Sequence, residues 1–380
     1  MSEWKEYKLG EIATFISEKV SVKDISIENY ISTENMVSDK GGIIVATNKP
    51  LDGTITKYYP NNILVSNIRP YFKKIWFSNK DGGCSNDVLC FEANTKYINS
   101  KYLYFLLSQD LFFDYVMLGS KGCKMPRGDK SHIMNWDISL PPLPEQIRIA
   151  SILSSLDDKI DLLHRENKTL EAMAETLFRQ WFIEEAKEDW EEKPLSFYGK
   201  IVCGKTPPKK ESKYFGGETP FIKIPDMHNK TFVINSEDSL TKEGVLYQKE
   251  KILPPFSIIV SCIATVGLVV LNAKEAQTNQ QINSIIPYEE EYRYFLYLHL
   301  MNMYDDLNAM ASGGTATLNL NTSNFSKIKI AYPTDDVLCA FNKQVSLLFD
   351  KIYNNQQQIQ TLIQQRDSLL PKLMSGEVKI

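Results

Sequence analysis

The stretch DDKIDLLHRENKTLEAMAETLFRQWF, from Asp157 to Phe182, decides the fold expected for this chain, because apolar residues recur in it at steps of three and four. A second stretch with the same periodicity, FDKIYNNQQQIQTLIQQRDSLLPKLMSGEVKI, begins at Phe349. Such a stripe offers two seam positions per heptad and has to pack against a partner helix, because it is too narrow to be buried alone. The two stretches therefore predict two long helices.

The second periodic series repeats the first at an offset of 192 residues, and polar residues interrupt both series at Asn167, Asn355 and Arg366. We predict that the two helices pair as a coiled coil. The alternative is that each helix packs only on its own globular segment, although such helices usually have a wider apolar face. The expected apolar seam consists of Leu153, Leu156, Ile160, Leu163, Leu170, Leu177, Val345, Leu348, Ile352, Ile359, Leu362 and Leu369.

The segments before the two helices repeat more loosely. The β-branched runs and scattered turn residues in them predict strands with a helix or two, an α+β class with a pseudo-twofold internal repeat. The uncharged stretch 252–273 contains prolines and small polar residues, so we expect two buried strands there and not a membrane helix. The proposed correspondences are Trp4 and Leu9 with Trp190 and Leu195, ILVSNIRP from Ile63 with IIVSCIA from Ile258, KYLYFLL from Lys101 with RYFLYLHL from Arg293, and NWDISLPPLP from Asn135 with NFSKIKIAYP from Asn324.

These repeats divide the chain into a globular segment 1–143, a helix 144–183, a globular segment 184–333 and a helix 334–380. Only the short link IEEAKED separates the first helix from the second globular segment, so a second helix that pairs with the first has to run antiparallel to it. The expected architecture is two globular domains separated by two long antiparallel coiled-coil helices. From Leu153 to Trp181 the helix would measure about 42 Å at ~1.5 Å per residue, close to the ~34–36 Å of one turn of B-DNA.

Patterns of catalytic and metal sites do not occur in the sequence. The six cysteines and four histidines have neither zinc-ligand nor disulfide spacing. There is no phosphate-binding loop and no dinucleotide fingerprint, and the adjacent carboxylates Asp157 and Asp158 are interpreted as solvated charge. The first residues, MSEWKEYKLG, contain no apolar signal region. We therefore expect a cytoplasmic, reduced protein with no catalytic residues, no metal and no cofactor of its own.

Basic residues gather in loops of both globular segments, although the net charge is −4. Local clusters of Lys and Arg suit contacts to phosphates, and nearby Asn, Gln and Thr side chains can reach base edges. This pattern favours binding to double-stranded DNA, but a charge run is also typical of an ordinary solvated face. The candidate DNA-binding residues are Arg69, Lys73, Lys74, Lys121, Lys124, Arg127 and Lys130 in the first segment, and Lys205, Thr206, Lys209, Lys210, Lys213, Asn279, Gln280 and Thr315 in the second.

Several stretches resemble one known family, the specificity subunits of type I restriction-modification systems. In the helical regions they are LPPLPEQIRIASILSSLDDKI, NKTLEAMAETLFRQWF and the terminal LLPKLMSGEVKI. In the globular segments, YISTENM from Tyr30, GKTP from Gly204 and PFIKIPDM from Pro220 are similar to recurrent pieces of that family's target recognition domains. The resemblance covers essentially the whole chain and is more specific in the helices than in the globular segments.

The resemblance implies that each globular segment is a target recognition domain that reads one half of a bipartite DNA site, while the helices set the spacing. It also implies a non-catalytic subunit that docks two methyltransferase subunits and, in the full complex, restriction and translocase subunits. S-adenosylmethionine, ATP and Mg²⁺ would then be bound by those partners. The amide-rich NNQQQIQTLIQQ leaves open whether the two docking surfaces are equivalent. The alternatives are a DNA-recognition protein of a related defence system that acts without a methyltransferase, and a coiled-coil spacer between protein partners.

Overall fold

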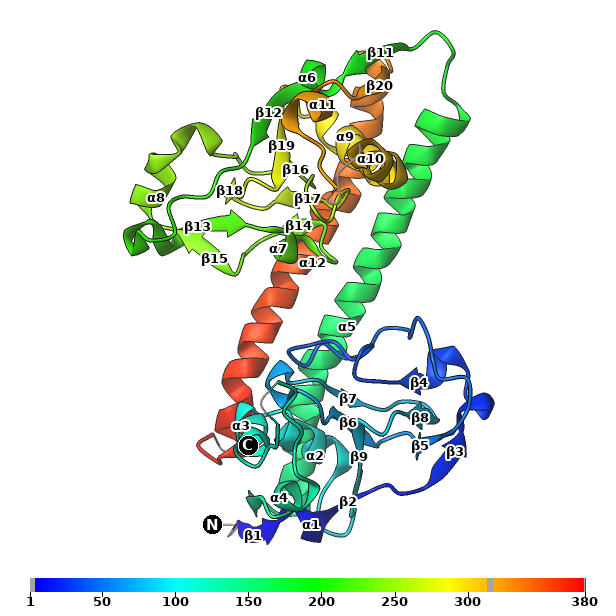
Figure 1. Ribbon diagram of the computed structural model, residues 1–380, viewed down its shortest axis with the longest axis vertical. Helices are drawn as coiled ribbons and strands as arrows, with labels where there is room; N and C mark the ends of the chain where they lie inside the picture. The colour runs from blue at the N-terminus through cyan, green and yellow to red at the C-terminus, as the bar shows by residue number, and fades with distance from the viewer. Residues whose placement is uncertain (1–3, 123, 313–317, 379) are drawn as a thin grey trace. The chain divides into compact units, whose positions relative to one another are not determined.

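The computed structural model describes residues 4–122, 124–312, 318–378 and 380. The chain forms two compact units (Figure 1). Unit 1 contains residues 1–160 and 362–380, and unit 2 contains residues 161–361. Helices α5 (Leu143–Arg179) and α12 (Asp335–Met374) each contribute one part to unit 1 and the other to unit 2.

Among the described residues, the globular part of unit 1 is built from short strands and four α-helices. Its described strands form a four-stranded sheet in the order β2-β9-β6-β7, a second four-stranded sheet in the order β3-β5-β8-β4, and the antiparallel pair β1-β10. The elements are β1 (Lys5–Lys8), α1 (Leu9–Ile12), β2 (Ala13–Phe15), β3 (Lys19–Ser21), β4 (Tyr30–Ile31), β5 (Thr54–Tyr58), β6 (Ile63–Ser66), β7 (Ile75–Phe77), β8 (Gly82–Cys84), β9 (Val88–Ala93), α2 (Ser100–Leu107), α3 (Asp110–Leu118), α4 (Lys130–Met134) and β10 (Asp137–Leu140).

Unit 2 follows the same plan with longer insertions. Its described strands form a five-stranded sheet in the order β12-β19-β16-β17-β14, a three-stranded sheet in the order β15-β13-β18, and the pair β11-β20. The elements are β11 (Glu191–Pro194), α6 (Leu195–Tyr198), β12 (Gly199–Cys203), β13 (Phe215–Ile222), α7 (Ile224–Met227), β14 (Phe232–Val233), β15 (Asp238–Leu240), α8 (Lys242–Tyr247), β16 (Ile258–Ser261), β17 (Val269–Asn272), β18 (Gln277–Thr278), β19 (Ile282–Pro287), α9 (Tyr292–Asn302), α10 (Tyr304–Ala311), α11 (Thr322–Ser326) and β20 (Lys329–Tyr332).

Strand pairing confirms the internal repeat and the α+β class. Ile63 of β6 lies opposite Phe91 of β9, and Ile258 of β16 lies opposite Ile285 of β19 in the same way. The uncharged stretch 252–273 forms the buried strands β16 and β17, as expected. No helix in the described parts of the chain is both long and apolar enough to cross a lipid bilayer.

One proposed correspondence is wrong by three residues. Aligning NWDISLPPLP with NFSKIKIAYP makes Lys329 the equivalent of Leu140. Strand pairing instead makes Tyr332 the equivalent of Leu140. Leu140 lies opposite Lys5 in the pair β1-β10, and Tyr332 lies opposite Glu191 in the pair β11-β20. The shared asparagine and aromatic residue at the start of each string misled the comparison, because the second such pair lies inside α11.

In unit 1 the two long helices pair through an enclosed ion pair. The Arg366 guanidinium donates to the Asp157 carboxylate at 2.9 Å, and these side chains are only 19% and 29% exposed. Burial raises the pKa of Asp157, and the Arg366 guanidinium opposes that rise. The expectation that Asp157 is a solvated charge is therefore wrong, because the partner helix covers it.

In unit 2 the pairing is centred on two buried amides, and the helices are also tied to the globular part. Asn355 donates to the side-chain oxygen of Asn167 at 2.9 Å. Gln356 accepts from the Phe232 backbone N–H at 3.1 Å, and the Gln360 amide oxygen accepts from Asn235 at 2.8 Å. The amides of α12 thus hold the segment around β14, which explains why this helix is more polar than α5.

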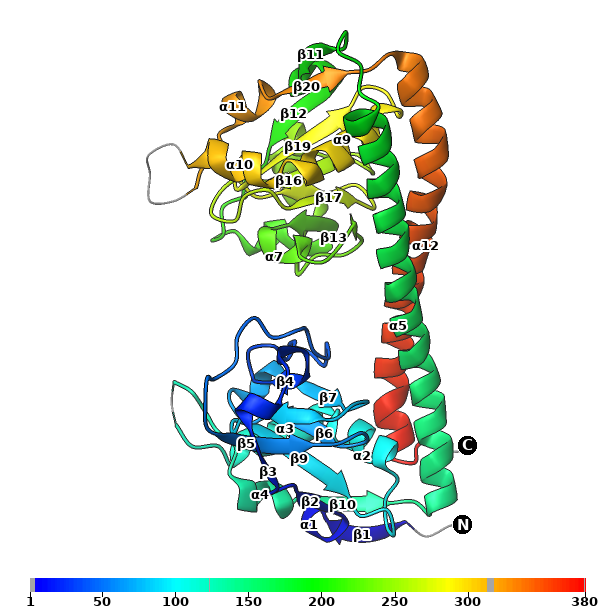
Figure 2. The ribbon, with the colours of Figure 1, turned by 90° about the vertical axis from the view of Figure 1, so that its right-hand side faces the viewer.

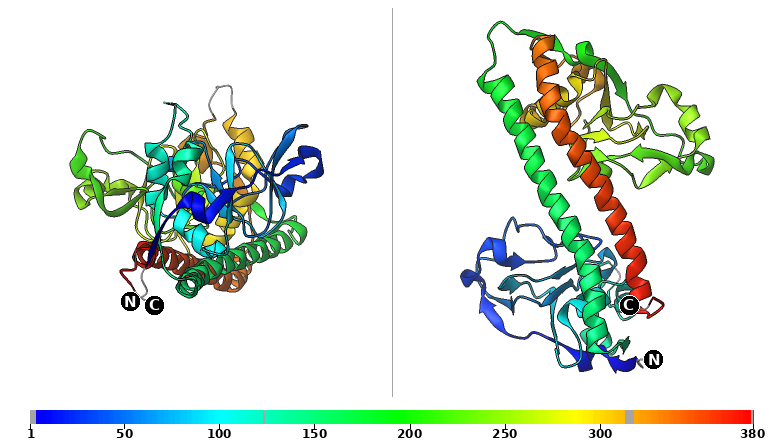
Figure 3. Two further views of the ribbon diagram at one scale, coloured as in Figure 1. Left: turned by 90° about the horizontal axis from the view of Figure 1, so that it is seen from below. Right: turned by 180° about the vertical axis from the view of Figure 1, so that it is seen from behind.

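Within each unit the paired parts of α5 and α12 run antiparallel and side by side (Figure 2), as expected. Each helix also packs on the globular part of each unit, but the alternative of packing there without helix pairing is wrong. In unit 1 the end of α12 lies near β1 (Figure 3), and a Cβ atom added to Gly376 would lie 3.1 Å from the Trp4 ring.

The seam residues Leu153, Ile160, Leu163, Val345, Ile352 and Ile359 are buried, and Leu156, Leu170, Leu177, Leu348, Leu362 and Leu369 are half-buried.

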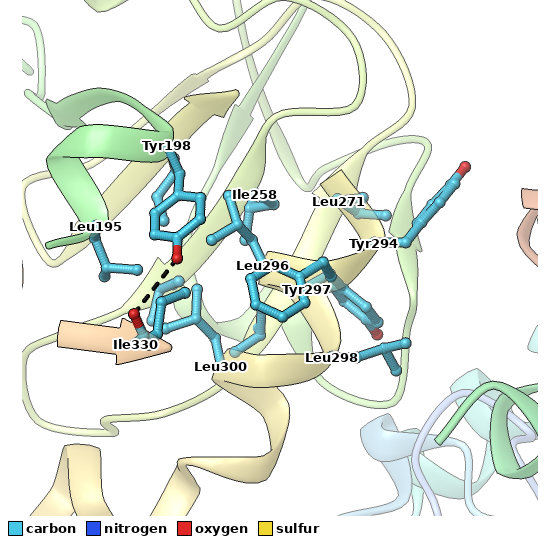
Figure 4. Packing of buried hydrophobic residues seen from close by; sticks show 14 of the residues in the cluster. Leu195, Tyr198, Ile258, Leu271, Tyr294, Leu296, Tyr297, Leu298, Leu300 and Ile330 are labelled. Atoms are coloured by element: carbon cyan, nitrogen blue, oxygen red, sulfur yellow. Dashed lines mark hydrogen bonds between the residues drawn. The ribbon is translucent and has the colours of Figure 1, made fainter. Parts of the chain in front are cut away.

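The core of unit 2 lies between its five-stranded sheet and α9 (Figure 4). Ile258 and Leu271 from the sheet pack with Leu296 of α9, and Ala174 and Val345 of the long helices join the same cluster. The Tyr198 hydroxyl donates to the Ile330 carbonyl at 3.4 Å, which ties α6 to the last strand. This core holds the sheet whose strand ends carry the candidate site.

Candidate nucleic-acid interface

In unit 2 the candidate residues at 204–206 and 278–280 meet at the edge of the sheets. The backbone N–H of Lys205 donates to the Thr278 carbonyl at 2.9 Å, and that of Gly204 donates to the Ile282 carbonyl at 3.0 Å. A Cβ atom added to Gly204 would lie 2.1 Å from the Asn279 carbonyl oxygen. Only glycine therefore allows the loop after β12 to lie against the loop after β18.

Side chains of the same two loops form a polar surface. The Thr206 hydroxyl donates to the Gln280 amide oxygen at 2.6 Å, and the Lys205 ammonium lies 5.4 Å from the centre of the Tyr247 ring. Asn279 is buried, and its side-chain oxygen accepts from the Gln281 backbone N–H at 3.1 Å. The structure thus brings Lys205, Thr206 and Gln280 together at the surface and gives Asn279 the role of shaping the loop.

Unit 1 has an equivalent pair of loops that sequence reasoning missed. The Lys19 ammonium donates to the Asn86 amide oxygen at 2.8 Å. Strand register makes Lys19 the equivalent of Lys205 and Asn86 the equivalent of Gln280, because Phe15 faces Phe91 as Ile201 faces Ile285. Lys19 lies beside Glu18 and outside any basic run, so charge clustering could not identify it. An alignment of the two repeats based on their strands would have identified Lys19 as the equivalent of Lys205.

The two basic runs of unit 1 converge beside these loops. The Arg69 backbone N–H donates to the Pro126 carbonyl at 2.8 Å, and Ile68 forms a β-bridge with Arg127. Arg127 forms an ion pair of 3.0 Å with Asp87, the residue after Asn86. The loops around residues 19, 69, 86 and 127 therefore form one continuous surface.

Several candidate lysines already have partners inside their own unit. Lys73 and Lys40 each lie 3.0 Å from the Asp110 carboxylate. Burial alone would raise the pKa of Asp110, but these two ammonium groups hold it below its usual range. Lys74 donates to the Thr33 carbonyl at 2.7 Å, and burial lowers its pKa. These contacts give Lys73 and Lys74 structural roles in addition to their charge.

Two further candidates also form surface ion pairs. Lys121 lies 2.7 Å from Asp129, and Lys213 lies 2.6 Å from Glu243. The hydrogen bond with Lys121 holds the pKa of Asp129 well below its usual range. Both lysines are largely exposed, so the carboxylates reduce their net charge without hiding them. Lys124, Lys130, Lys209 and Lys210 are exposed, and Thr315 lies outside the described residues.

Among the described residues there is no group of three or more His, Cys, Asp or Glu side chains that could hold a metal ion. What the site offers is a set of ammonium and guanidinium groups beside amides and hydroxyls, carried on loops at strand ends. Cations of this kind bind phosphates, and amides pair with base edges. The arrangement fits recognition of a nucleic acid better than chemistry on a small substrate.

The chain matches a family model described as "Type I restriction modification DNA specificity domain" twice, over residues 1–172 and 187–368. It is 34% identical to the HindI type I restriction enzyme specificity subunit of Haemophilus influenzae, over 100% of both chains. It is 28% identical to the MjaIX specificity subunit of Methanocaldococcus jannaschii, over 74% of this chain and 69% of that relative.

A solved structure supports the fold independently. The S subunit of a type I restriction-modification system from M. genitalium matches 97% of this chain, and 96% of that subunit is covered, with a TM-score of 0.61. The two sequences are 16% identical, so this likeness concerns the fold alone.

Proposed function

Because the chain belongs to the family of type I restriction-modification DNA specificity subunits, we propose that its two units read the two halves of one bipartite DNA site. As a member of this family, the chain is the DNA-recognition subunit of such a system and not its catalytic component. We assign the role of target recognition domains to segments 1–143 and 184–333. Segments 144–183 and 334–380 are the spacers.

The observation that supports this proposal is a pair of adjacent loops that occurs in both units, at Lys19 and Asn86 in unit 1 and at Thr206 and Gln280 in unit 2. Asn86 in unit 1 and Gln280 in unit 2 occupy equivalent positions, and each amide oxygen accepts one hydrogen bond from a neighbouring Lys or Thr. That hydrogen bond orients the amide. Asn and Gln side chains can pair with adenine through its N6 and N7 atoms, which gives them a direct role in base recognition. We infer that Asn86 and Gln280 contact bases, each in its own half-site.

The cations around these amides would contact phosphates. In unit 1 they are Lys19, Arg69 and Arg127, and in unit 2 they are Lys205, Lys209 and Lys210. Phosphate contacts position a protein on the duplex and contribute most of its non-specific affinity, but they do not identify bases. This division of roles predicts different phenotypes for the two sets of residues.

The long helices would also dock the methyltransferase subunits, which bring S-adenosylmethionine. Restriction subunits with ATP and Mg²⁺ complete the assembly. On α5, Ile152, Leu162 and Met173 are exposed apolar residues suited to a partner's apolar face. The amides of α12 that anchor β14 are already engaged. We therefore propose that the two docking surfaces are not equivalent.

The test is to express the chain with its cognate methyltransferase and to map N6-methyladenine in cellular DNA. The expected result is one bipartite motif with a fixed spacer. Gln280→Ala should relax base preference in one half of the motif, and Asn86→Ala in the other half. A good amide–adenine pair discriminates by ~1–3 kcal/mol, which corresponds to about 5- to 150-fold in affinity.

Gln364→Ala provides the matched control, since Gln364 is an exposed amide on α12 and should leave the motif unchanged. Copurification should yield two methyltransferase copies per chain. A methylation motif without a second half would show that the two units do not each read one half of a bipartite site. An unchanged motif in both amide variants would remove Asn86 and Gln280 from base recognition.

A further inference from the structure

The turn between β6 and β7 presents two aromatic side chains at the surface of unit 1. Tyr71 and Phe72 are 47% and 37% exposed, and their ring centres lie 4.7 Å apart. They belong to a short 3-10 turn, Pro70–Phe72. Neighbouring exposed aromatic side chains are uncommon on a surface without a binding role.

This turn is held in a strained conformation at both ends. Arg69 and Lys73 both have φ of 50°, in the left-handed region that residues with a Cβ atom rarely adopt. Proteins keep such strain where the surrounding structure imposes it, most often at functional sites. A glycine at either position would have relieved it.

Three anchors make the turn rigid. The Arg69 backbone N–H donates to the Pro126 carbonyl at 2.8 Å. The N–H groups of Asp39 and Lys40 donate to the Phe72 and Lys73 carbonyls at 2.9 Å. Asp110 adds ion pairs of 3.0 Å to Lys40 and Lys73. The two rings are therefore presented without the ordering cost of a flexible loop.

The surroundings of the turn are cationic and continuous with the candidate interface. Arg69 is exposed at its start, and the Lys74 ammonium lies 5.8 Å from the centre of the Phe72 ring. The bridge between Ile68 and Arg127 connects the turn to the loop that pairs with Asp87. This chain of contacts links the turn to Asp87, the residue after Asn86.

Unit 2 does not repeat this feature. The equivalent of Arg69 is Ala264, because Ala264 N–H donates to the Leu318 carbonyl as Arg69 N–H donates to that of Pro126. Strand register makes Gly267 the equivalent of Lys73. Thr265 and Val266 therefore stand in place of the three residues Pro70–Phe72, and Val266 is buried. A Cβ atom on Gly267 would lie 2.8 Å from the Tyr304 ring. The turn of unit 2 thus presents only small residues at the surface, Ala264 and Thr265, whereas the turn of unit 1 presents two aromatic rings.

We propose that Tyr71 and Phe72 form an aromatic wedge that inserts at one base step of the half-site read by unit 1. The proposal rests on the DNA-recognition function stated above. Apolar side chains that enter a base step partly unstack it and bend the duplex, and the energy of unstacking is recovered through additional contacts. A rigid, cation-flanked pair of rings meets both requirements. Unit 2 lacks the wedge, so only one half-site is deformed.

The test places 2-aminopurine at successive positions of the duplex identified by methylation mapping, and follows its fluorescence when the full chain binds. Unstacking raises the fluorescence. The half-site of unit 1 is the one whose bases change in the Asn86→Ala variant. Wild-type protein should give a rise at one or two adjacent positions in this half-site and none in the other. The double variant Tyr71→Ala/Phe72→Ala should lose the rise and bind about 5- to 150-fold more weakly, the range of base–aromatic stacking.

Two features separate a wedge from a structural role. The slope of affinity against salt should stay unchanged in the double variant, since no phosphate contact is removed. Phe72→Leu keeps an apolar wedge and should preserve the fluorescence rise. Tyr288→Ala removes an exposed tyrosine of unit 2 and serves as the matched control.

A wild-type protein that binds the mapped duplex without any rise would overturn the wedge while leaving DNA recognition intact. So would a rise that persists in the double variant. A wild-type protein that binds neither the mapped duplex nor any other would instead contradict the proposed function itself. If the double variant unfolds at a lower temperature than wild type, Phe72→Leu with a persistent rise still supports the wedge, and Phe72→Leu without a rise counts against it.

Discussion

At the scale of single residues, the candidate interface contains two kinds of cation. Lys73, Lys121 and Lys213 each face a carboxylate of their own unit. Lys209 and Lys210 are exposed and belong to none of the ion pairs found among the described residues. A surface ion pair contributes little stability, but it lowers the positive potential that a phosphate would meet. The lysines without such a partner should therefore dominate the salt dependence of binding.

The double variant Lys209→Gln/Lys210→Gln tests this difference. Each phosphate contact contributes ~0.9 to the slope of log affinity against log salt, so the slope should become shallower by about 1.8. Base preference should not change, because phosphates do not report sequence. Equilibrium binding to the mapped duplex at several salt concentrations measures both quantities. Lys159→Gln on α5, also exposed, is the control, and an unchanged slope in the double variant would place the DNA surface of unit 2 elsewhere.

At the scale of elements, the two helices pair through different contacts in each unit. The offset of 192 residues relates Asp157 and Arg366 of unit 1 to Phe349 and Ala174 of unit 2. Phe349 and Ala174 are buried in the core of unit 2, whereas Asp157 and Arg366 form an ion pair. An enclosed ion pair often adds little net stability, but loss of one partner leaves an uncompensated charge. Such a pair selects one register of the helices over others.

Replacement of the ion pair by its apolar equivalent provides a direct test. Arg366→Ala alone should lower the free energy of unfolding by up to about 3 kcal/mol, and Asp157→Phe alone should also destabilise the protein. The double variant Asp157→Phe/Arg366→Ala copies the pair of unit 2 and should recover most of the loss. Urea unfolding of the four proteins forms the cycle. If the loss in the double variant equals the sum of the losses in the two single variants, the two side chains do not interact.

The stability of the Arg366→Ala variant should depend on pH in a defined direction. Burial already raises the pKa of Asp157 in the folded protein, and removal of Arg366 should raise it further. A carboxyl group whose folded pKa lies above its unfolded pKa favours folding in its protonated form, so the penalty grows as pH rises from the unfolded pKa to the folded pKa. The loss of unfolding free energy caused by Arg366→Ala should therefore be smaller near pH 4 than at pH 7.

At the scale of the whole molecule, α5 and α12 each pass through both compact units. The helices are thus part of the core of each unit as well as the covalent connection between them. If the helices set the separation of the half-sites, their length should determine the spacer of the DNA motif.

Removal of one heptad from each helix, 163–169 and 355–361, tests the spacing role. The register on both sides of the deletion is kept, and the two buried amides Asn167 and Asn355 leave together. Each helix becomes about 10 Å shorter at ~1.5 Å per residue, which equals roughly three base pairs of ~3.4 Å. The mapped motif should keep its half-sites and lose one to three spacer base pairs. Methylation at the original spacing, or with new half-site bases, would contradict the role.

The sequence by itself determined the two helices, the internal repeat, the α+β class and the family. All of these depend on local spacing: heptads give the helices, β-branched runs give the strands, and the helical stretches carry the family resemblance. Only strand pairing decided which residues of the site meet, because Lys19 and Asn86 are 67 positions apart and come together through the order β2-β9. The same long-range pairing corrected the alignment around β20 and enclosed Asp157 beside Arg366. A charge count along the chain cannot distinguish Lys73, held by Asp110, from exposed Lys209, since the acid that pairs with a lysine is chosen by the tertiary fold.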